Sequence, residues 1–190
     1  MIPFIHNVKI KLPATVKWFC IKIVLLFTIW ELLYTFILLP SRVPDTQITN
    51  ITAVGTAKIL SWFYPNDQLS IKPAAAAIPV NTMVSVYRNC HKVIGIADGC
   101  NAFELQVLFV GILLSIDKIK ALSFRYILIG VPLISVCNMF RCALIGWLNI
   151  TQQVNLSNFA HHYLFKILIY GLIFYMWKRY TENKSTYMHA

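Results

Sequence analysis

Three kinds of side chain in this chain of 190 residues could together carry out nucleophilic acyl transfer. Cys100 stands in the run IADGCNAFELQVLF, Arg141 ends the run NMFR, and His161 and His162 stand in NFAHHYLF. A cysteine thiolate attacks carbonyl carbons, a histidine can take the thiol proton and return it to a leaving group, and an arginine can stabilise the developing oxyanion. These residue types predict a thiol-dependent site, provided that the fold brings them together.

The residues around Cys100 and Arg141 indicate how the two side chains are held. Asp98 is expected to be the N-cap of a helix whose first turn contains Cys100, where free N–H groups and the helix dipole favour a thiolate. The negative charge of Asp98 itself acts in the opposite direction. Asn138 lies three residues before Arg141, on the same helical face. Asp98, Asn101 and Asn138 are therefore the expected supporting residues.

The composition places these residues in a membrane protein. Hydrophobic residues make up 58% of the chain and charged residues 13%, and the mean hydropathy is +0.64. Soluble domains are about 45–50% apolar and about 25% charged. A chain of this length cannot bury so much apolar surface in a water-facing globule, so lipid must cover it.

Four apolar stretches predict four transmembrane helices, since a bilayer core needs about 20 helical residues. The second stretch is short for a span, and the third is long and contains Pro132. We therefore expect an all-α polytopic membrane protein that forms one membrane domain, residues 1–190. The expected spans are about 18–39, 100–116, 122–150 and 159–177, and the outer segment is 41–99.

The net charge of +10 follows the spans and does not indicate nucleic-acid binding. Basic residues gather before the first stretch, between the second and third, and after the fourth, and such clusters mark the cytoplasmic side of a membrane. Both termini are then cytoplasmic, and the chain contacts lipids and no nucleic acid. The clusters are Lys9, Lys11, Lys17 and Lys22; Lys118, Lys120 and Arg125; and Lys178, Arg179 and Lys184.

The outer segment is predicted to contain a short interfacial helix and a β-hairpin. Residues 51–64 have small and apolar residues at helical spacing and end in three aromatic residues, which suits a helix at headgroup level. The runs TMVSVYRNC and HKVIGIADG, residues 82–90 and 91–99, are rich in β-branched residues and predict two paired strands. This hairpin would hold Cys100 at a defined height over the membrane.

The three chemical groups are expected at one depth in the membrane. Cys100 begins the second span on the outer side. Arg141 lies about 29 Å along the third span from Leu122, near the outer boundary, at 1.5 Å per residue. The histidines begin the last span on the same side. An arginine inside an apolar span is costly and indicates a function.

The order of cysteine, then arginine in an N-x-x-R helix, then histidine at the start of the last span resembles the exosortase/archaeosortase family. The motifs here read DGCNAFE, NMFRCALI and FAHHYLFKILIYGLIFYMW, and the short four-span exosortases of bacterial membranes are the most similar. The family often has glycine after Cys-Ser or Cys-Asn, whereas this chain has Ala102 there.

The resemblance implies a cysteine transpeptidase or protease of the bacterial inner membrane whose site faces outward. Its substrates would be exported proteins with a C-terminal tail made of a short motif, one transmembrane helix and a basic cluster. Cys100 would be the nucleophile and Arg141 the transition-state stabiliser. His162 or His161 would be the acid/base, with His162 slightly favoured by the alignment of the last span. No cofactor or metal is implied, and the acceptor stays open.

Two other functions are compatible with the residues. A membrane scaffold protein could carry a Cys90–Cys100 disulfide, because both cysteines flank the predicted hairpin on the outer side. A four-span thiol–disulfide oxidoreductase would usually need a C-x-x-C pair, and none of the five cysteines has that spacing. Whether Cys100 is a free thiol separates the first alternative from an enzyme.

Overall fold

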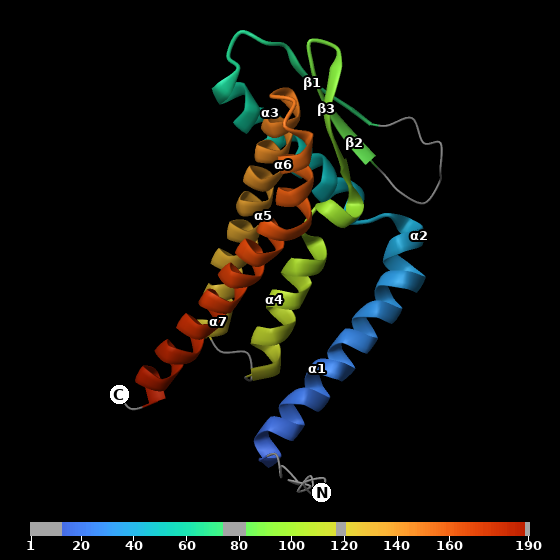
Figure 1. The fold of residues 1–190 in the computed structure, drawn as a ribbon. Helices are drawn as coiled ribbons and strands as arrows, with labels where there is room; N and C mark the ends of the chain where they lie inside the picture. Colours follow the sequence, from blue (N-terminus) through green and yellow to red (C-terminus); the bar gives the residue numbers. More distant parts are fainter. Residues whose placement is uncertain (1–12, 74–82, 117–120, 189–190) are drawn as a thin grey trace, which may run out of the picture.

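The computed structural model describes residues 13–73, 83–116 and 121–188 of the chain. Predictions that fall elsewhere, on Lys9, Lys11, Lys118 and Lys120, lie outside the described residues. Helices make up most of the described chain, and one small sheet accompanies them (Figure 1). The elements follow in the order α1 (Ala14–Leu33), η1 (Tyr34–Leu38), α2 (Leu39–Ser41), α3 (Asp45–Phe63), β1 (Leu69–Pro73), β2 (Met83–Arg88), β3 (His91–Ala97), η2 (Asp98–Cys100), α4 (Phe103–Ile116), α5 (Ala121–Ile150), α6 (Val154–Phe159), η3 (Ala160–Leu164) and α7 (Phe165–Met188).

Two described helices are long and apolar enough to cross a membrane, where four were predicted. They are Val16–Ser41, which joins α1, η1 and α2, and Ser123–Ile150 within α5. The predicted second span becomes α4, whose 14 residues extend about 21 Å, short of a bilayer core of about 30 Å. The predicted fourth span becomes α7, in which the charged residues at both ends limit the apolar run.

In Figure 1, α1, α4 and α7 lie mainly in the lower part, and α5 runs from there up beside α3 and the sheet. Both described ends of the chain lie at the lower end, opposite the sheet. Helix α4 contacts α1 and α5, and α5 contacts α7. Gly130 permits the close approach within this group, because a Cβ there would lie 2.3 Å from the ring of Phe109. A hydrogen bond of 2.7 Å between the hydroxyls of Ser123 and Tyr180 joins α5 to α7.

Helix α3 is longer than the predicted interfacial helix and packs directly on α5. Its buried face carries small residues at helical spacing, which lets the two helices approach closely. Thr49, Thr52, Ala53 and Thr56 are each at most 2% exposed. The first part of α3 was missed because its sequence, DTQITN, is polar although its Asp45 and Thr49 are buried.

The predicted hairpin is confirmed, and the structure adds a third strand. Strands β2 and β3 pair antiparallel, with Ser85 opposite Gly95, and β1 pairs antiparallel with the other edge of β2. Sequence analysis missed β1 because it has only five residues, LSIKP, and ends at a proline. The apolar face of β2 packs on α3, which fixes the sheet above the long helices.

The hairpin turn consists of two residues, Asn89 and Cys90, at φ 48° and 69°. Two-residue turns with both φ values positive suit the twist of the strands and favour Asn-Gly. Here cysteine occupies the glycine position, so its Cβ is strained against the backbone.

We expect Cys90→Gly to stabilise the fold by about 1 kcal/mol, because glycine adopts a positive φ without this strain. Thermal unfolding of the detergent-solubilised protein measures the change. A loss of stability would contradict the prediction and would favour a covalent role for the Cys90 sulfur.

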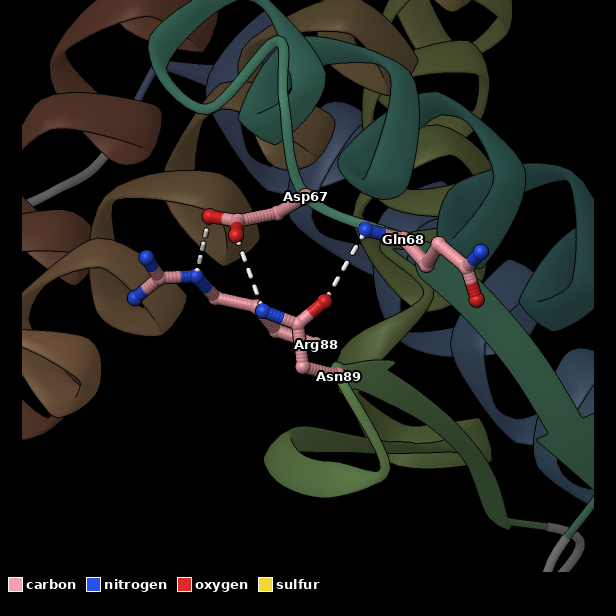
Figure 2. Close-up of polar contacts among 4 residues, drawn as sticks. All are labelled: Asp67, Gln68, Arg88 and Asn89. Carbon is pink, nitrogen blue, oxygen red and sulfur yellow. Dashed lines mark hydrogen bonds and ion pairs between the residues drawn. The ribbon is translucent and has the colours of Figure 1, made fainter.

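A polar cluster lies at the end of the sheet that carries the hairpin turn (Figure 2). Arg88 Nε donates to Asp67 Oδ2 at 2.6 Å, and Asn89 Nδ2 donates to Asp67 Oδ1 at 2.8 Å. The backbone N–H of Gln68 donates to Asn89 Oδ1 at 3.0 Å. The hydrogen bonds from Asn89 and Arg88 lower the pKa of Asp67 below its ordinary value.

Since the pKa of Asp67 is lower in the folded chain, its carboxylate stabilises the fold above the ordinary pKa, and this contribution disappears as the pH falls through the folded pKa. Asp67→Asn should therefore lower the unfolding temperature slightly at pH 7. The difference from wild type should narrow as the pH falls below about 4 and close once the pH is below the lowered pKa of Asp67. Unfolding temperatures measured at a series of pH values test this, and a difference that is independent of pH would contradict it.

Candidate functional site

Cys100 lies in a short 3-10 turn, η2, between β3 and α4. The predicted helix start is wrong, since α4 begins at Phe103 and Asp98 does not cap it. The carboxylate of Asp98 instead accepts a hydrogen bond of 2.8 Å from Thr49 Oγ1 on α3. Asn101 does the capping, because its Oδ1 accepts the backbone N–H of Phe103 at 2.8 Å. The hydrogen bond between Asp98 and Thr49 therefore attaches the Cys100 turn to α3.

A buried network fastens the Cys100 turn to α3. Asn101 is 2% exposed, and its Nδ2 donates to Asp45 Oδ1 at 2.9 Å and to Thr49 Oγ1 at 3.3 Å. Asp45 and Thr49 are 3% and 0% exposed. Sequence analysis assigned Asn101 a supporting role but missed Asp45 and Thr49, which lie more than 50 residues away in a polar run. Removing one member would leave a buried polar group without its partner.

Ala102 adopts a left-handed backbone conformation, with φ at 67°. This conformation costs an L-residue about 1–2 kcal/mol and is the one that glycine adopts freely.

Helix α5 brings Asn138 and Arg141 to the same turn, as their spacing predicted. Asn138 is fully buried, and its Nδ2 donates to the backbone carbonyl of Cys100 at 2.8 Å. The Oδ1 of Asn138 accepts a hydrogen bond of 3.1 Å from Arg141 Nη1. Asn138 thus sets the position of Arg141 relative to Cys100, although 38 residues separate Asn138 from Cys100.

The guanidinium of Arg141 also contacts His161. Arg141 Nη2 lies 3.2 Å from His161 Nδ1. Because a guanidinium only donates, Nδ1 accepts, and the proton of the neutral ring is on Nε2. His161 lies in η3, a π-helical turn, and such turns often occur at functional sites. The side chain of His162 lies outside what the structure describes.

Cys100, Arg141 and His161 line one pocket of about 370 Å³. They come from η2, α5 and η3, so three separated segments of the chain meet there. The buried Nε of Arg141 has no hydrogen-bond partner among the described residues. The other lining residues are Lys92, Val93, Ile94, Gly95, Ile96, Cys142, Ile145, Asn149, Ser157 and Asn158.

A second, apolar groove of about 670 Å³ lies beside this pocket. It is formed by side chains of α3, α5 and the last helix, among them Phe63, Trp147 and Phe165. Arg141 lines both the groove and the pocket. The guanidinium therefore stands at the boundary between a polar space and an apolar one.

The arrangement offers a free thiol and an imidazole at one pocket, beside a guanidinium whose buried Nε has no partner among the described residues. Among the described residues, no three His, Cys, Asp or Glu side chains are grouped so that they could hold a metal.

The structure does not pair Cys90 with Cys100, and both are free thiols. They lie at opposite ends of β3, whose seven residues extend about 23 Å. Cysteines whose Cα atoms are more than about 7 Å apart cannot be joined without moving the backbone. The disulfide of the scaffold alternative is thus absent from this fold.

No family model, curated protein or solved structure matches the chain.

Proposed function

We propose that this chain is a membrane cysteine transpeptidase or protease of the exosortase type. It cleaves a C-terminal tail from exported proteins at a site on the outer side of a bacterial inner membrane. The observation that carries the proposal is the chain of contacts that runs from the backbone of Cys100 through Asn138 and Arg141 to His161, around one pocket.

The site supports a two-step acyl transfer. Cys100 Sγ bonds to the scissile carbonyl carbon, the C–N bond breaks, and the leaving amine receives the proton that the thiol gave up, carried by His161. An acceptor amine or water then attacks the thioester, and the thiol re-forms. Neither step changes an oxidation state, so the reaction needs no redox partner.

Arg141 links proton transfer to His161 with stabilisation of the oxyanion. While it donates to His161 Nδ1, the ring cannot accept the thiol proton at that atom. When the guanidinium turns from Nδ1 toward the carbonyl oxygen of a bound substrate, Nδ1 becomes free to take the thiol proton, and the guanidinium is in place for the oxyanion that forms as the thiolate attacks. The unpaired Nε supplies a further donor, and a buried donor that gains a partner recovers about 1–3 kcal/mol.

The proposed topology has four spans, with both termini in the cytoplasm. Helices α4 and α7 would enter the membrane beside the two long helices, since each packs on α5. Both described ends of the chain lie opposite the sheet (Figure 1), which supports a topology with the sheet and the Cys100 turn on the outer side.

Intact mass spectrometry of exported proteins tests the proposal, in cells that carry wild-type or Cys100→Ala chain. We expect a set of exported proteins to keep a hydrophobic, basic-ended tail only in the mutant cells. Cys20→Ala is the matched control, because Cys20 is an exposed free cysteine on α1 that lines neither the pocket nor the apolar groove. Identical tails in wild-type and Cys100→Ala cells would refute the nucleophile assignment.

A further inference from the structure

Strand β3 is one edge of the three-stranded sheet. The order is β1-β2-β3, and among the described residues β3 pairs with β2 alone. An edge strand presents backbone N–H and C=O groups that can pair with another extended chain. Peptides bind many proteins by adding a strand at such an edge.

This edge borders the pocket that contains the proposed catalytic residues. Residues 92–96 of β3 line the pocket together with Cys100, Arg141 and His161. Asn149 Nδ2, on α5, donates to the carbonyl of Val93 at 3.0 Å. The Val93 carbonyl therefore faces away from β2, and it already accepts the hydrogen bond from the Asn149 side chain. Val93 lies at a register shift in the ladder, so the sides are followed from its carbonyl along the chain. In a trans peptide the N–H of Ile94 points opposite to that carbonyl, toward β2, and the next residue, Gly95, is therefore expected to present its N–H and C=O to the open side.

The pocket and the apolar groove suit two successive parts of one substrate. The pocket has polar lining residues, among them Ser157 and Asn158, whereas aromatic and aliphatic side chains line the groove. Arg141 joins the two spaces. A chain that is extended and then becomes an apolar helix matches this sequence of environments.

We propose that the extended segment of the substrate before its scissile bond binds as an additional strand along the open edge of β3. This inference rests on the proposed function. Strand β3 runs from the hairpin turn toward Cys100 (Figure 1). A substrate that comes from its exported domain toward its own membrane helix runs in the same direction, so the added strand is parallel to β3.

Backbone N-methylation of the substrate tests the pairing without changing the enzyme. The probes are synthetic peptides copied from tails that Cys100→Ala cells retain, each methylated at one backbone nitrogen, and cleaved by the wild-type full chain in membranes. We expect KM to rise about fivefold at every second residue before the scissile bond and to change little at the residues between, because only alternate N–H groups of a strand face its partner.

A pair of variants at Gly95 tests the same edge from the side of the enzyme. Gly95→Ala keeps the N–H, and the atoms nearest its added Cβ belong to the flexible side chains of Met83 and Lys92, so it is the reference against which Gly95→Pro is compared. Gly95→Pro removes the N–H and should raise KM without lowering kcat. If Gly95→Pro unfolds, the methylation series alone decides.

The outcomes distinguish a failure of the strand pairing from a failure of the proposed function. Retained tails together with an effect that alternates along the peptide support both. Retained tails and cleaved peptides without alternation overturn the strand pairing and leave the transpeptidase. If Cys100→Ala cells retain no tails, both proposals fail.

Discussion

Arg141→Lys should lower kcat/KM for tail cleavage by at least about 100-fold, the usual effect of removing an oxyanion donor. Arg141 bridges Asn138 and His161 through two different nitrogens, and its Nε has no partner among the described residues. A lysine keeps the positive charge but has one compact ammonium group, which cannot hold this planar arrangement. The rate of peptide cleavage in membranes measures the loss.

Arg125→Lys is the matched control for this substitution. Arg125 is on the same helix, α5, and is exposed, so its replacement should leave the rate unchanged. Equal expression and equal unfolding temperatures of the two variants would show that each folds. A normal rate in Arg141→Lys would mean that charge alone is needed, and the stabilising role of the guanidinium would then be rejected.

His161→Ala should lower kcat by about 100-fold to 10,000-fold, the range expected for loss of a general acid/base. His162→Ala should retain most of the activity, because the described contact with Arg141 and the lining of the pocket both belong to His161. Single-turnover rates of the two variants measure the effect, and added imidazole should partly restore His161→Ala. If His162→Ala were the inactive variant, the assignment slightly favoured by the sequence would hold.

Much of the architecture could be predicted from local pattern. Apolar runs predicted α1 and α5, because burial in lipid requires uninterrupted apolar residues over a bilayer's thickness. Alternating β-branched residues predicted β2 and β3, and the N-x-x-R spacing placed Asn138 and Arg141 on one helical face. These features depend on residues close together in the chain, which is why periodicity reveals them.

The number of helices long enough to cross a membrane was less predictable. Four apolar stretches suggested four complete spans, yet only two described helices have the required length and composition. The residues before Phe103 form a turn instead of continuing α4, because Asn101 binds α3 and Ala102 is left-handed. A contact with a distant helix thus makes the apolar helix begin at Phe103, later than predicted.

The sequence by itself determined the chemical groups, the apolar pattern and the hairpin, because each follows from residue type and short-range spacing. Only the tertiary structure decided that Asp98 binds Thr49, that His161 contacts Arg141, and that β3 borders the pocket. Each of these contacts joins segments that are tens of residues apart in the chain. Such contacts depend on how helices and strands pack in three dimensions, and the spacing of residues along one chain does not specify that packing.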